Sequence, residues 1–391
     1  MQVSTAQTVE RRFDDISLAE LRHRHSYKWR AYPEDVLPAF VAEMDFRPAP
    51  VIVRALTAAA ELGDTGYACP QPELGEAYSH FALRRFGWRV EPTDVTLSPD
   101  VMSGITELLR LALKPGAGVV INPPVYPPFF RQVAEAGCRV IESPLLLDEA
   151  GYHLDLNGLE AAFRGGARAL LLCSPHNPTG IIYPARELEQ VAELAERYGA
   201  LVFSDEIHAP LVLPGREFTP YLAASPVAAA HGIAFVAASK GWNLPGLKCA
   251  QIVSQSTEMR ALIQRLPPSF GVHAGLFGIL AAVAAYEAGD AWLDQVLETV
   301  QRNADFLAEA VRNRFPQVAF TPPSATYLAW LDCRELNLPE EPVDHFLKQG
   351  RVALGGGPPY GSTGCGYLRV NIGTTAAILE QVIERMETAL R

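Results

Sequence analysis

The sequence predicts an α/β protein with two domains. Helices flank a mostly parallel sheet in the larger domain, and the smaller domain is of the α+β type. Three observations support this prediction. Short apolar segments alternate with amphipathic segments through the middle of the chain, the two ends lack this alternation, and 391 residues is about two to three times the length of a typical single domain.

The middle of the chain has the pattern of buried strands separated by helices. Residues 105–112 and the segment from Pro184 to Gly199 carry apolar side chains at helical spacing. Strands buried on both faces belong to sheets that helices cover on both sides, so this pattern predicts a parallel or mostly parallel sheet. Short apolar runs predict strands at 118–121, 169–173, 201–203, 233–237 and 250–253.

The two ends of the chain have a different pattern. Residues 1–46 are polar and show no regular period. Near the other end, the sequence predicts a long helix at 291–315, strands at 327–331, 352–354 and 367–372, and a final helix with Ile378, Val382 and Met386 on one face. We therefore predict a large domain at 47–282 and a small domain built from both termini, residues 1–46 and 283–391.

The composition excludes several classes of protein. Apolar residues make up 49% of the chain, which is too many for a disordered protein. The net charge of −11 argues against nucleic acid and anionic membranes as partners, and the longest apolar run, residues 274–286, is too short for a membrane helix. Six scattered cysteines predict reduced thiols in the cytoplasm, and neither they nor the nine histidines have metal-ligand spacing.

Polar loops follow the predicted strands. In an open α/β sheet, ligands bind beyond the carboxyl ends of the strands. The loops at this edge contain an amide, Asn177, a carboxylate, Asp205, a lysine, Lys240, and an aromatic ring, Tyr126. They occupy residues 98–104, 123–129, 174–180, 204–208 and 238–243.

These residue types are the ones that pyridoxal phosphate requires. Its aldehyde forms a Schiff base with a lysine amine, and its pyridine nitrogen needs a carboxylate that keeps it protonated. Its ring stacks on an aromatic side chain, and its phosphate binds backbone N–H groups at the start of a helix. The sequence therefore predicts pyridoxal 5'-phosphate as cofactor.

Three motifs carry a resemblance to a known family. Residues 174–180 read Ser-Pro-His-Asn-Pro-Thr-Gly, residues 204–208 read Ser-Asp-Glu-Ile-His, and residues 239–248 read Ser-Lys-Gly-Trp-Asn-Leu-Pro-Gly-Leu-Lys. In this order and spacing they resemble the aminotransferase class I/II superfamily of pyridoxal-phosphate enzymes. Lys28-Trp29 and residues 42–46 narrow the resemblance to its cystathionine β-lyase or C–S lyase branch, the MalY/PatB group. The resemblance implies the aspartate-aminotransferase-like fold, fold type I.

The resemblance implies roles for individual residues. Lys240, one of only five lysines in the chain, would form the Schiff base and act as the base toward the substrate. Asp205 would pair with the pyridinium nitrogen, and Tyr126 would stack on the ring. Asn177, in a possible cis bond to Pro178, would contact the phenolate oxygen. The remaining cofactor contacts would come from the backbone amides of Val101 and Met102 and from His208, Ser239 and Lys248.

The substrate and assembly contacts also follow from the resemblance. Arg369, with Asn177, would bind the substrate α-carboxylate. Tyr67 resembles the residue that relatives send across a dimer interface to the neighbouring phosphate, which implies a homodimer with shared active sites. Lys248 stands where many relatives have arginine, and a lysine lacks the bidentate fork of a guanidinium. Asp100 stands where glycine is frequent.

The resemblance implies a C–S β-lyase that cleaves cystathionine or another cysteine S-conjugate to a thiol, pyruvate and ammonia. Two alternatives stay open, because the same cofactor apparatus serves several reactions. One is an aminotransferase or a decarboxylating deaminase acting on an S-conjugated amino acid. The other is a regulatory protein that binds pyridoxal phosphate. A nicotinamide dehydrogenase is disfavoured, because no G-x-G-x-x-G follows the first strand.

Overall fold

The computed structural model describes residues 12–69 and 71–391. The first eleven residues of the predicted small domain lie outside this range. Among the described residues, no single helix is long and apolar enough to cross a membrane. The pair α13 (Leu276–Ala288) and α14 (Asp290–Arg314) reaches the required length and composition only together, with a bend of 82° between them.

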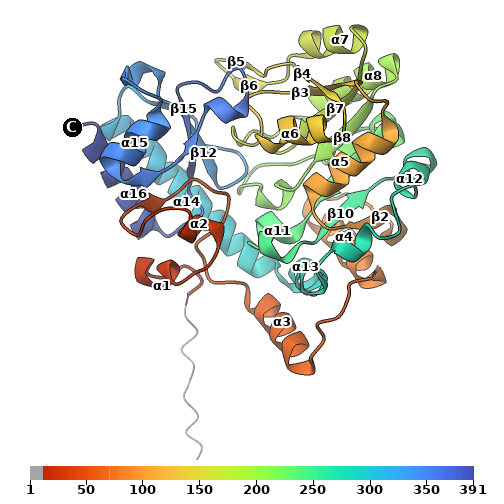
Figure 1. The fold of residues 1–391 in the computed structure, drawn as a ribbon, viewed down its shortest axis with the longest axis horizontal. Helices are drawn as coiled ribbons and strands as arrows, with labels where there is room; N and C mark the ends of the chain where they lie inside the picture. The colour runs from red at the N-terminus through yellow and green to blue at the C-terminus, as the bar shows by residue number, and fades with distance from the viewer. Residues whose placement is uncertain (1–11, 70) are drawn as a thin grey trace, which may run out of the picture.

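A seven-stranded sheet forms the centre of the larger part of the molecule (Figure 1). Within it β10 alone runs in the direction opposite to the other six strands, so the mostly parallel sheet predicted from the sequence is confirmed. The strand order is β2 (Val95–Ser98), β10 (Ala250–Val253), β9 (Gly232–Val236), β8 (Leu201–Asp205), β7 (Ala167–Cys173), β3 (Gly118–Ile121) and β4 (Arg139–Glu142).

Helices cover both faces of this sheet. Alternate residues of β7 point to opposite faces, as in any strand: Leu171 packs with one hydrophobic cluster, and Leu170 and Leu172 pack with the other. Pro184 occupies the N-cap of α8 (Ala185–Tyr198) rather than its first helical position, one residue from the prediction. On the Leu171 side lie α5 (Val101–Ala112), α6 (Pro128–Glu135) and α12 (Thr257–Ile263), and on the other lie α4 (Pro72–Phe86), α7 (Leu156–Arg164), α8 (Ala185–Tyr198), α10 (Pro226–His231) and α13.

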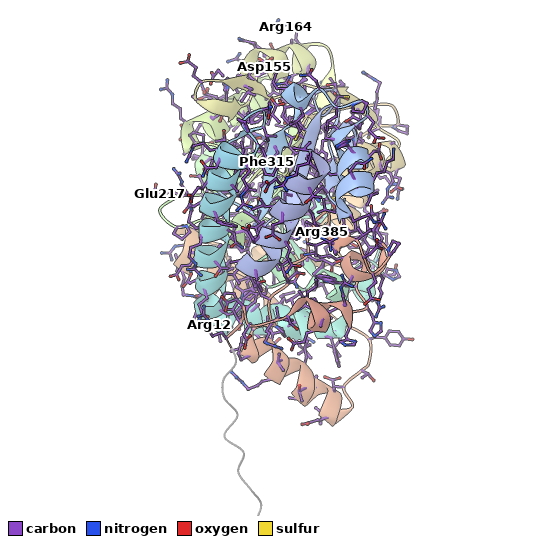
Figure 2. The ribbon with its side chains drawn as sticks, turned by 90° about the vertical axis from the view of Figure 1, so that its left-hand side faces the viewer. Arg12, Asp155, Arg164, Glu217, Phe315 and Arg385 are labelled. Atoms are coloured by element: carbon purple, nitrogen blue, oxygen red, sulfur yellow. The ribbon has the colours of Figure 1, made fainter. Side chains whose placement is uncertain are left out.

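A second, four-stranded antiparallel sheet lies in the C-terminal part of the chain. Arg385 of α16 (Ala376–Ala389), labelled in Figure 2, donates hydrogen bonds to the carbonyls of Asp35 and Arg351, which joins the N-terminal segment to the C-terminal part of the chain. The strand order is β11 (Ala319–Phe320), β12 (Leu328–Asp332), β15 (Tyr367–Asn371) and β14 (Gly355–Gly356), and the helices around it are α14, α15 (Pro342–Gly350) and α16 (Ala376–Ala389).

The N-terminal segment contains elements too short to show a period in the sequence. They are α1 (Leu18–Arg22), α2 (Tyr27–Arg30) and β1 (Leu37–Pro38). The predicted strand at 352–354 is β13 (Val352–Ala353), which pairs in parallel with β1 rather than joining the four-stranded sheet. The predicted domain boundary at 282/283 falls inside α13, and the division into two domains stays a prediction.

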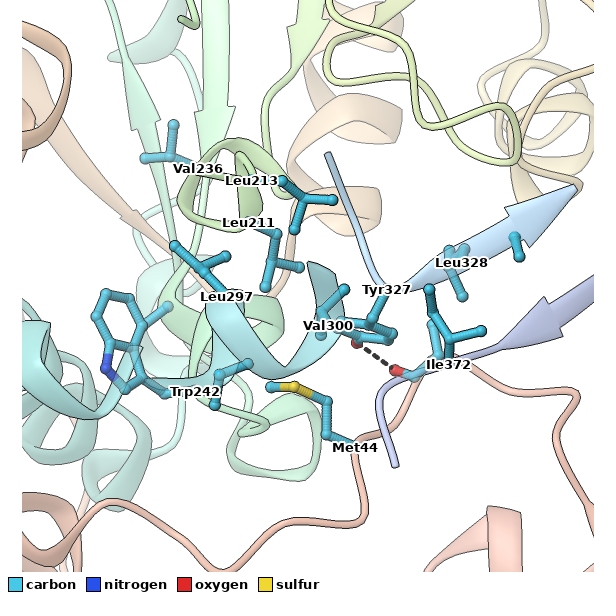
Figure 3. Close-up of a cluster of buried hydrophobic side chains, with 14 of the residues drawn as sticks. Met44, Leu211, Leu213, Val236, Trp242, Leu297, Val300, Tyr327, Leu328 and Ile372 are labelled. Carbon is cyan, nitrogen blue, oxygen red and sulfur yellow. Dashed lines mark hydrogen bonds between the residues drawn. The ribbon is translucent and has the colours of Figure 1, made fainter. Parts of the chain in front are cut away.

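A continuous core joins the two sheets. Figure 3 shows Trp242 and Leu211 from the larger part packed in the same cluster as Leu297 of α14 and Tyr327 beside β12. Met44, from the N-terminal segment, lies in this core and is fully buried. By contrast, α3 (Pro50–Leu62) projects from the body of the molecule (Figure 1).

Candidate active site

A cavity of about 500 Å³ lies at the carboxyl ends of the parallel strands. This is the edge at which the sequence placed the ligand site. Ten of the eleven predicted site residues line the cavity, namely Val101, Met102, Tyr126, Asn177, Asp205, His208, Ser239, Lys240, Lys248 and Arg369.

Lys240 follows β9 on the short helix α11 (Ala238–Gly241). Its Nζ donates a hydrogen bond of 2.9 Å to the carbonyl of Ala42. Burial, together with the smaller effect of the positive charge of Arg369, lowers the pKa of the amine from 10.5 to about 8. A lysine with such a pKa is partly neutral near physiological pH, as a base or nucleophile must be.

Asp205 ends β8 and is almost fully buried. Its Oδ1 accepts the N–H of Ile207 at 3.1 Å. Burial raises the pKa of the carboxyl to about 7, while the charge of Lys240 acts in the opposite direction. A cation placed against this carboxylate would keep it ionised, which is what a protonated pyridine ring offers.

Arg369 and Asn177 meet at the floor of the cavity. Arg369 lies on β15, and its Nη1 donates to Asn177 Oδ1 at 3.1 Å while its Nη2 donates to the carbonyl of Phe40 at 2.7 Å. The structure thus brings together two predicted site residues that are 192 positions apart. The Asn177–Pro178 bond is cis, as the resemblance indicated.

Tyr126 lies in the loop after β3, half-buried beside the cavity. Burial, together with the smaller effect of the charge of Asp205, raises the pKa of its hydroxyl to about 12. The loop is held from two directions: the N–H of Val125 donates to the carbonyl of Tyr360, and the ring of His176 contacts the carbonyl of Pro124 at 2.7 Å.

The N-terminus of α5 supplies Val101 and Met102. The first N–H groups of a helix have no partner within the helix, so they are free to bind an anion. Gly104 lets this helix approach the sheet closely, because an added Cβ would lie 3.0 Å from Ser98 Oγ and 3.2 Å from the ring of Phe235.

Asp100 caps the same helix. Its Oδ1 accepts the N–H of Ser103 at 2.8 Å, and its Oδ2 accepts a hydrogen bond from Lys248 Nζ at 3.1 Å. The sequence did not indicate this pair. The ion pair between Asp100 and Lys248 holds the Lys248 ammonium beside the N-terminus of α5.

His208 is almost fully buried at the edge of the cavity. Its Nδ1 has no hydrogen-bond partner among the described residues. Burial keeps the pKa of the imidazole well below its ordinary value, and the nearby charges of Lys240 and Arg369 act in the same direction. The ring is therefore neutral at physiological pH.

Tyr67 is the one predicted site residue that the structure does not bring to the cavity. It lies beyond α3 and is 92% exposed. In a single chain it contacts none of the other site residues named above.

Sequence reasoning missed parts of the cavity wall. The carbonyls of Phe40 and Ala42 contact Arg369 and Lys240, and a backbone carbonyl has no residue-type signature. Gln132, held by Thr106 Oγ1 at 2.6 Å, also lines the cavity, as does Cys249. Helical spacing marked neither of these residues.

The residues present fit pyridoxal phosphate. The cavity has a buried amine for the aldehyde, a buried carboxylate that forms no salt bridge with the described residues, and an aromatic ring beside them. A helix N-terminus with a hydroxyl, Ser239, and an ammonium, Lys248, matches the phosphate.

The comparisons with known proteins agree with this fit. Residues 41–386 match the family aminotransferase class I and II. The chain is 43% identical to a Mycobacterium leprae protein that bears the provisional name cystathionine beta-lyase, over 96% of this chain and 98% of that protein. It is 34% identical to a cystathionine beta-lyase of Corynebacterium glutamicum, over 95% of this chain and 99% of that protein.

A solved structure extends the agreement to the fold and the cofactor. Cystalysin from Treponema denticola, whose crystal structure contains pyridoxal 5'-phosphate, superimposes with a TM-score of 0.89 at 26% identity, over 94% of this chain and 96% of that one. This protein thus belongs to the aminotransferase class I and II family of pyridoxal-phosphate enzymes, and within it to the branch of the cystathionine beta-lyases and C–S lyases.

Proposed function

We propose that the protein is a pyridoxal-phosphate-dependent C–S β-lyase that converts a cysteine S-conjugate, such as cystathionine, and water into a thiol, pyruvate and ammonia. One structural observation carries this proposal, and the names of the relatives agree with it. A single cavity holds the Lys240 amine, the Asp205 carboxylate and the Arg369 guanidinium, and relatives with up to 43% identity carry cystathionine beta-lyase in their names.

The cofactor would be held by residues already described. Lys240 would bond to its aldehyde, Asp205 would pair with its ring nitrogen, and Tyr126 would stack on the ring. Val101 and Met102 would offer backbone N–H groups to the phosphate, with Ser239 and Lys248 beside them. When bound, pyridoxal phosphate supplies an electron sink for the pair released at the substrate Cα.

The chain's own groups would orient the substrate and move the proton. Arg369, steadied by Asn177 and the carbonyl of Phe40, would bind the α-carboxylate through its guanidinium. Lys240 would then take the Cα proton, since its amine is buried and partly neutral. The sulfur leaves as a thiolate, takes up a proton, and departs as the thiol.

The pH dependence of kcat follows from the pKa of Lys240. The amine accepts a proton only when it is neutral, and its pKa is lowered to about 8. We expect kcat to rise with pH up to about 8 and to level off above it, as measured by pyruvate release between pH 6 and 10. A kcat that keeps rising up to pH 10, with no levelling near pH 8, would contradict the assignment of Lys240 as the base.

We also propose that the enzyme acts as a cytoplasmic homodimer with shared active sites. Tyr67 is exposed in a single chain, as a residue that reaches a neighbouring cofactor phosphate would be. A Tyr67→Phe variant that keeps its dimeric state but binds the cofactor less tightly would support this role. A wild-type protein that sediments as an active monomer would rule it out.

The test of the reaction is a panel of cysteine S-conjugates with mass spectrometry of every product. Free thiol with pyruvate in equal amounts supports the β-lyase. A keto acid or an aldehyde that retains the sulfur identifies an aminotransferase or a decarboxylating deaminase instead. Bound cofactor without turnover of any conjugate would favour the regulatory alternative.

A further inference from the structure

Residues 40–46, which we call the strap, form a segment without helix or strand beside the cavity. Val41 and Ala42 line the cavity itself. Side chains from distant parts of the chain donate to the strap at every residue: Arg369 to Phe40 O, Asn371 to Val41 O and Glu43 O, Lys240 and Tyr327 to Ala42 O, Lys28 to Glu43 O, Asn243 to Met44 O, and Arg24 to Met44 O, Asp45 O and Phe46 O.

Two of these donors are the groups assigned to the chemistry. Arg369 Nη2 lies 2.7 Å from the carbonyl of Phe40, and Lys240 Nζ lies 2.9 Å from that of Ala42. The two carbonyls are two residues apart on one stretch of backbone. The register of the strap therefore sets the relative positions of the proposed carboxylate-binding group and the proposed base.

A buried ion pair holds this register. Lys28 Nζ lies 2.7 Å from Asp45 Oδ2, and each of the two side chains is only 1% exposed. The other carboxylate oxygen of Asp45 accepts the indole N–H of Trp29 at 3.2 Å, and Lys28 also donates to the carbonyl of Glu43. The N–H of Asp45 donates to Gly373 O, just beyond the strand that carries Arg369.

The stability of the fold gives little reason to keep such a buried ion pair. The desolvation of two charges offsets much of their attraction, and apolar side chains of similar volume often stabilise a protein equally well. The ion pair instead selects one register of the strap, because its two charges are paired with each other in that register only. A slip by one residue would put Met44 or Phe46 opposite Lys28 and leave two charges buried without partners.

We propose that Lys28 and Asp45 are positioning residues, which fix the register of the strap and thereby align Lys240 with Arg369. The assignment of these two aligned groups rests on the proposed function. The pair itself touches neither group, and acts on both through the strap backbone.

The test replaces both charges at once, in a Lys28→Met/Asp45→Leu variant of the holoenzyme. We expect its thermal unfolding to stay within about 5 °C of wild type, while kcat/KM for the best S-conjugate falls at least 30-fold. Amide exchange in residues 40–46 should become faster at the same time. The matched control is Lys348→Met/Glu340→Leu, which removes a more exposed ion pair and should leave kcat/KM and the exchange pattern unchanged.

A second measurement distinguishes positioning from general loosening of the fold. Lys240 is faced by Arg369, Asp205, Glu43 and the neutral ring of His208. Without a fixed strap, water reaches the amine and its pKa returns toward the ordinary value. The rise of kcat with pH should therefore move to higher pH by about one unit in the double variant and stay in place in the control.

Three other outcomes of these tests also decide about the proposed role of Lys28 and Asp45. A folded double variant with wild-type kcat/KM and wild-type exchange in residues 40–46 would overturn the proposal. If that variant does not fold, Trp29→Phe takes its place, because it removes one hydrogen bond from Asp45 and keeps both charges. This variant should lower kcat/KM and speed up amide exchange in residues 40–46, and wild-type values of both would overturn the proposal. If wild type cleaves no conjugate, the proposed function fails, and amide exchange of the strap still tests the pair.

Discussion

We expect a Lys240→Ala variant to lose β-elimination activity by about four orders of magnitude. Proton transfer by a positioned side chain contributes up to about 10⁴-fold, and this variant also loses the amine that would bond to the cofactor. The measurement is pyruvate release under single-turnover and steady-state conditions. The absorption spectrum should change too, because the cofactor can no longer bond covalently to the chain.

The matched control for this variant is Lys114→Ala. Lys114 is exposed and follows α5, away from the residues that line the cavity. It should keep both wild-type activity and the wild-type spectrum. A Lys240→Ala protein that retains more than about a hundredth of the activity would show that another group removes the proton, since a positioned base is worth at least about 10²-fold.

We expect an Asp205→Asn variant to lose about 10²- to 10³-fold in kcat, the range found when one preorganised electrostatic group is removed from an active site. The amide has nearly the same shape as the carboxylate and can still accept the N–H of Ile207, which the carboxylate accepts at 3.1 Å. It carries no negative charge, however, and so cannot keep a pyridine nitrogen protonated. The loss should therefore appear in kcat with little change in folding.

Glu206→Gln provides a matched control one residue away. Glu206 is also buried, but its carboxylate accepts hydrogen bonds from Ser204 Oγ and the N–H of Tyr221. It does not line the cavity. Burial raises its pKa to about 8, so the carboxyl is largely neutral already and the amide should preserve most of the activity. Equal losses in the two variants would remove the special role proposed for Asp205.

The sequence could place ten predicted site residues at one cavity for a simple geometric reason. Buried parallel strands have recognisable apolar runs, and the residues that follow such strands share one edge of the sheet. Asn177 and Lys240 each follow a strand, Asp205 is the last residue of one, and all three line one cavity. The prediction of Arg369 depended on the family resemblance as well, because this residue lies within β15 and the chain is rich in arginine.

Other features depended on contacts that no local pattern reveals. Lys248 was predicted as a phosphate ligand, and the structure pairs it with Asp100, which lies 148 residues away. Residues 1–46 showed no period in the sequence. In the part of this segment that the structure describes, α1, α2 and β1 are too short to show one, and residues 40–42 are held by side-chain hydrogen bonds to their carbonyls. Tyr67 has no place in the site of a single chain, and its role stays a prediction.

The sequence by itself determined the sheet, the edge at which ligands bind, and the chemical types of the site residues. Those properties depend on the order of residues along short segments, where the spacing of apolar side chains and the position after a strand are local facts. Only the tertiary structure decided the register of residues 40–46, the pairing of Lys28 with Asp45, and the lowered pKa of Lys240. These features arise from burial and from carbonyl contacts between distant segments. A local pattern of side chains indicates neither the burial of a given group nor the position of a backbone oxygen.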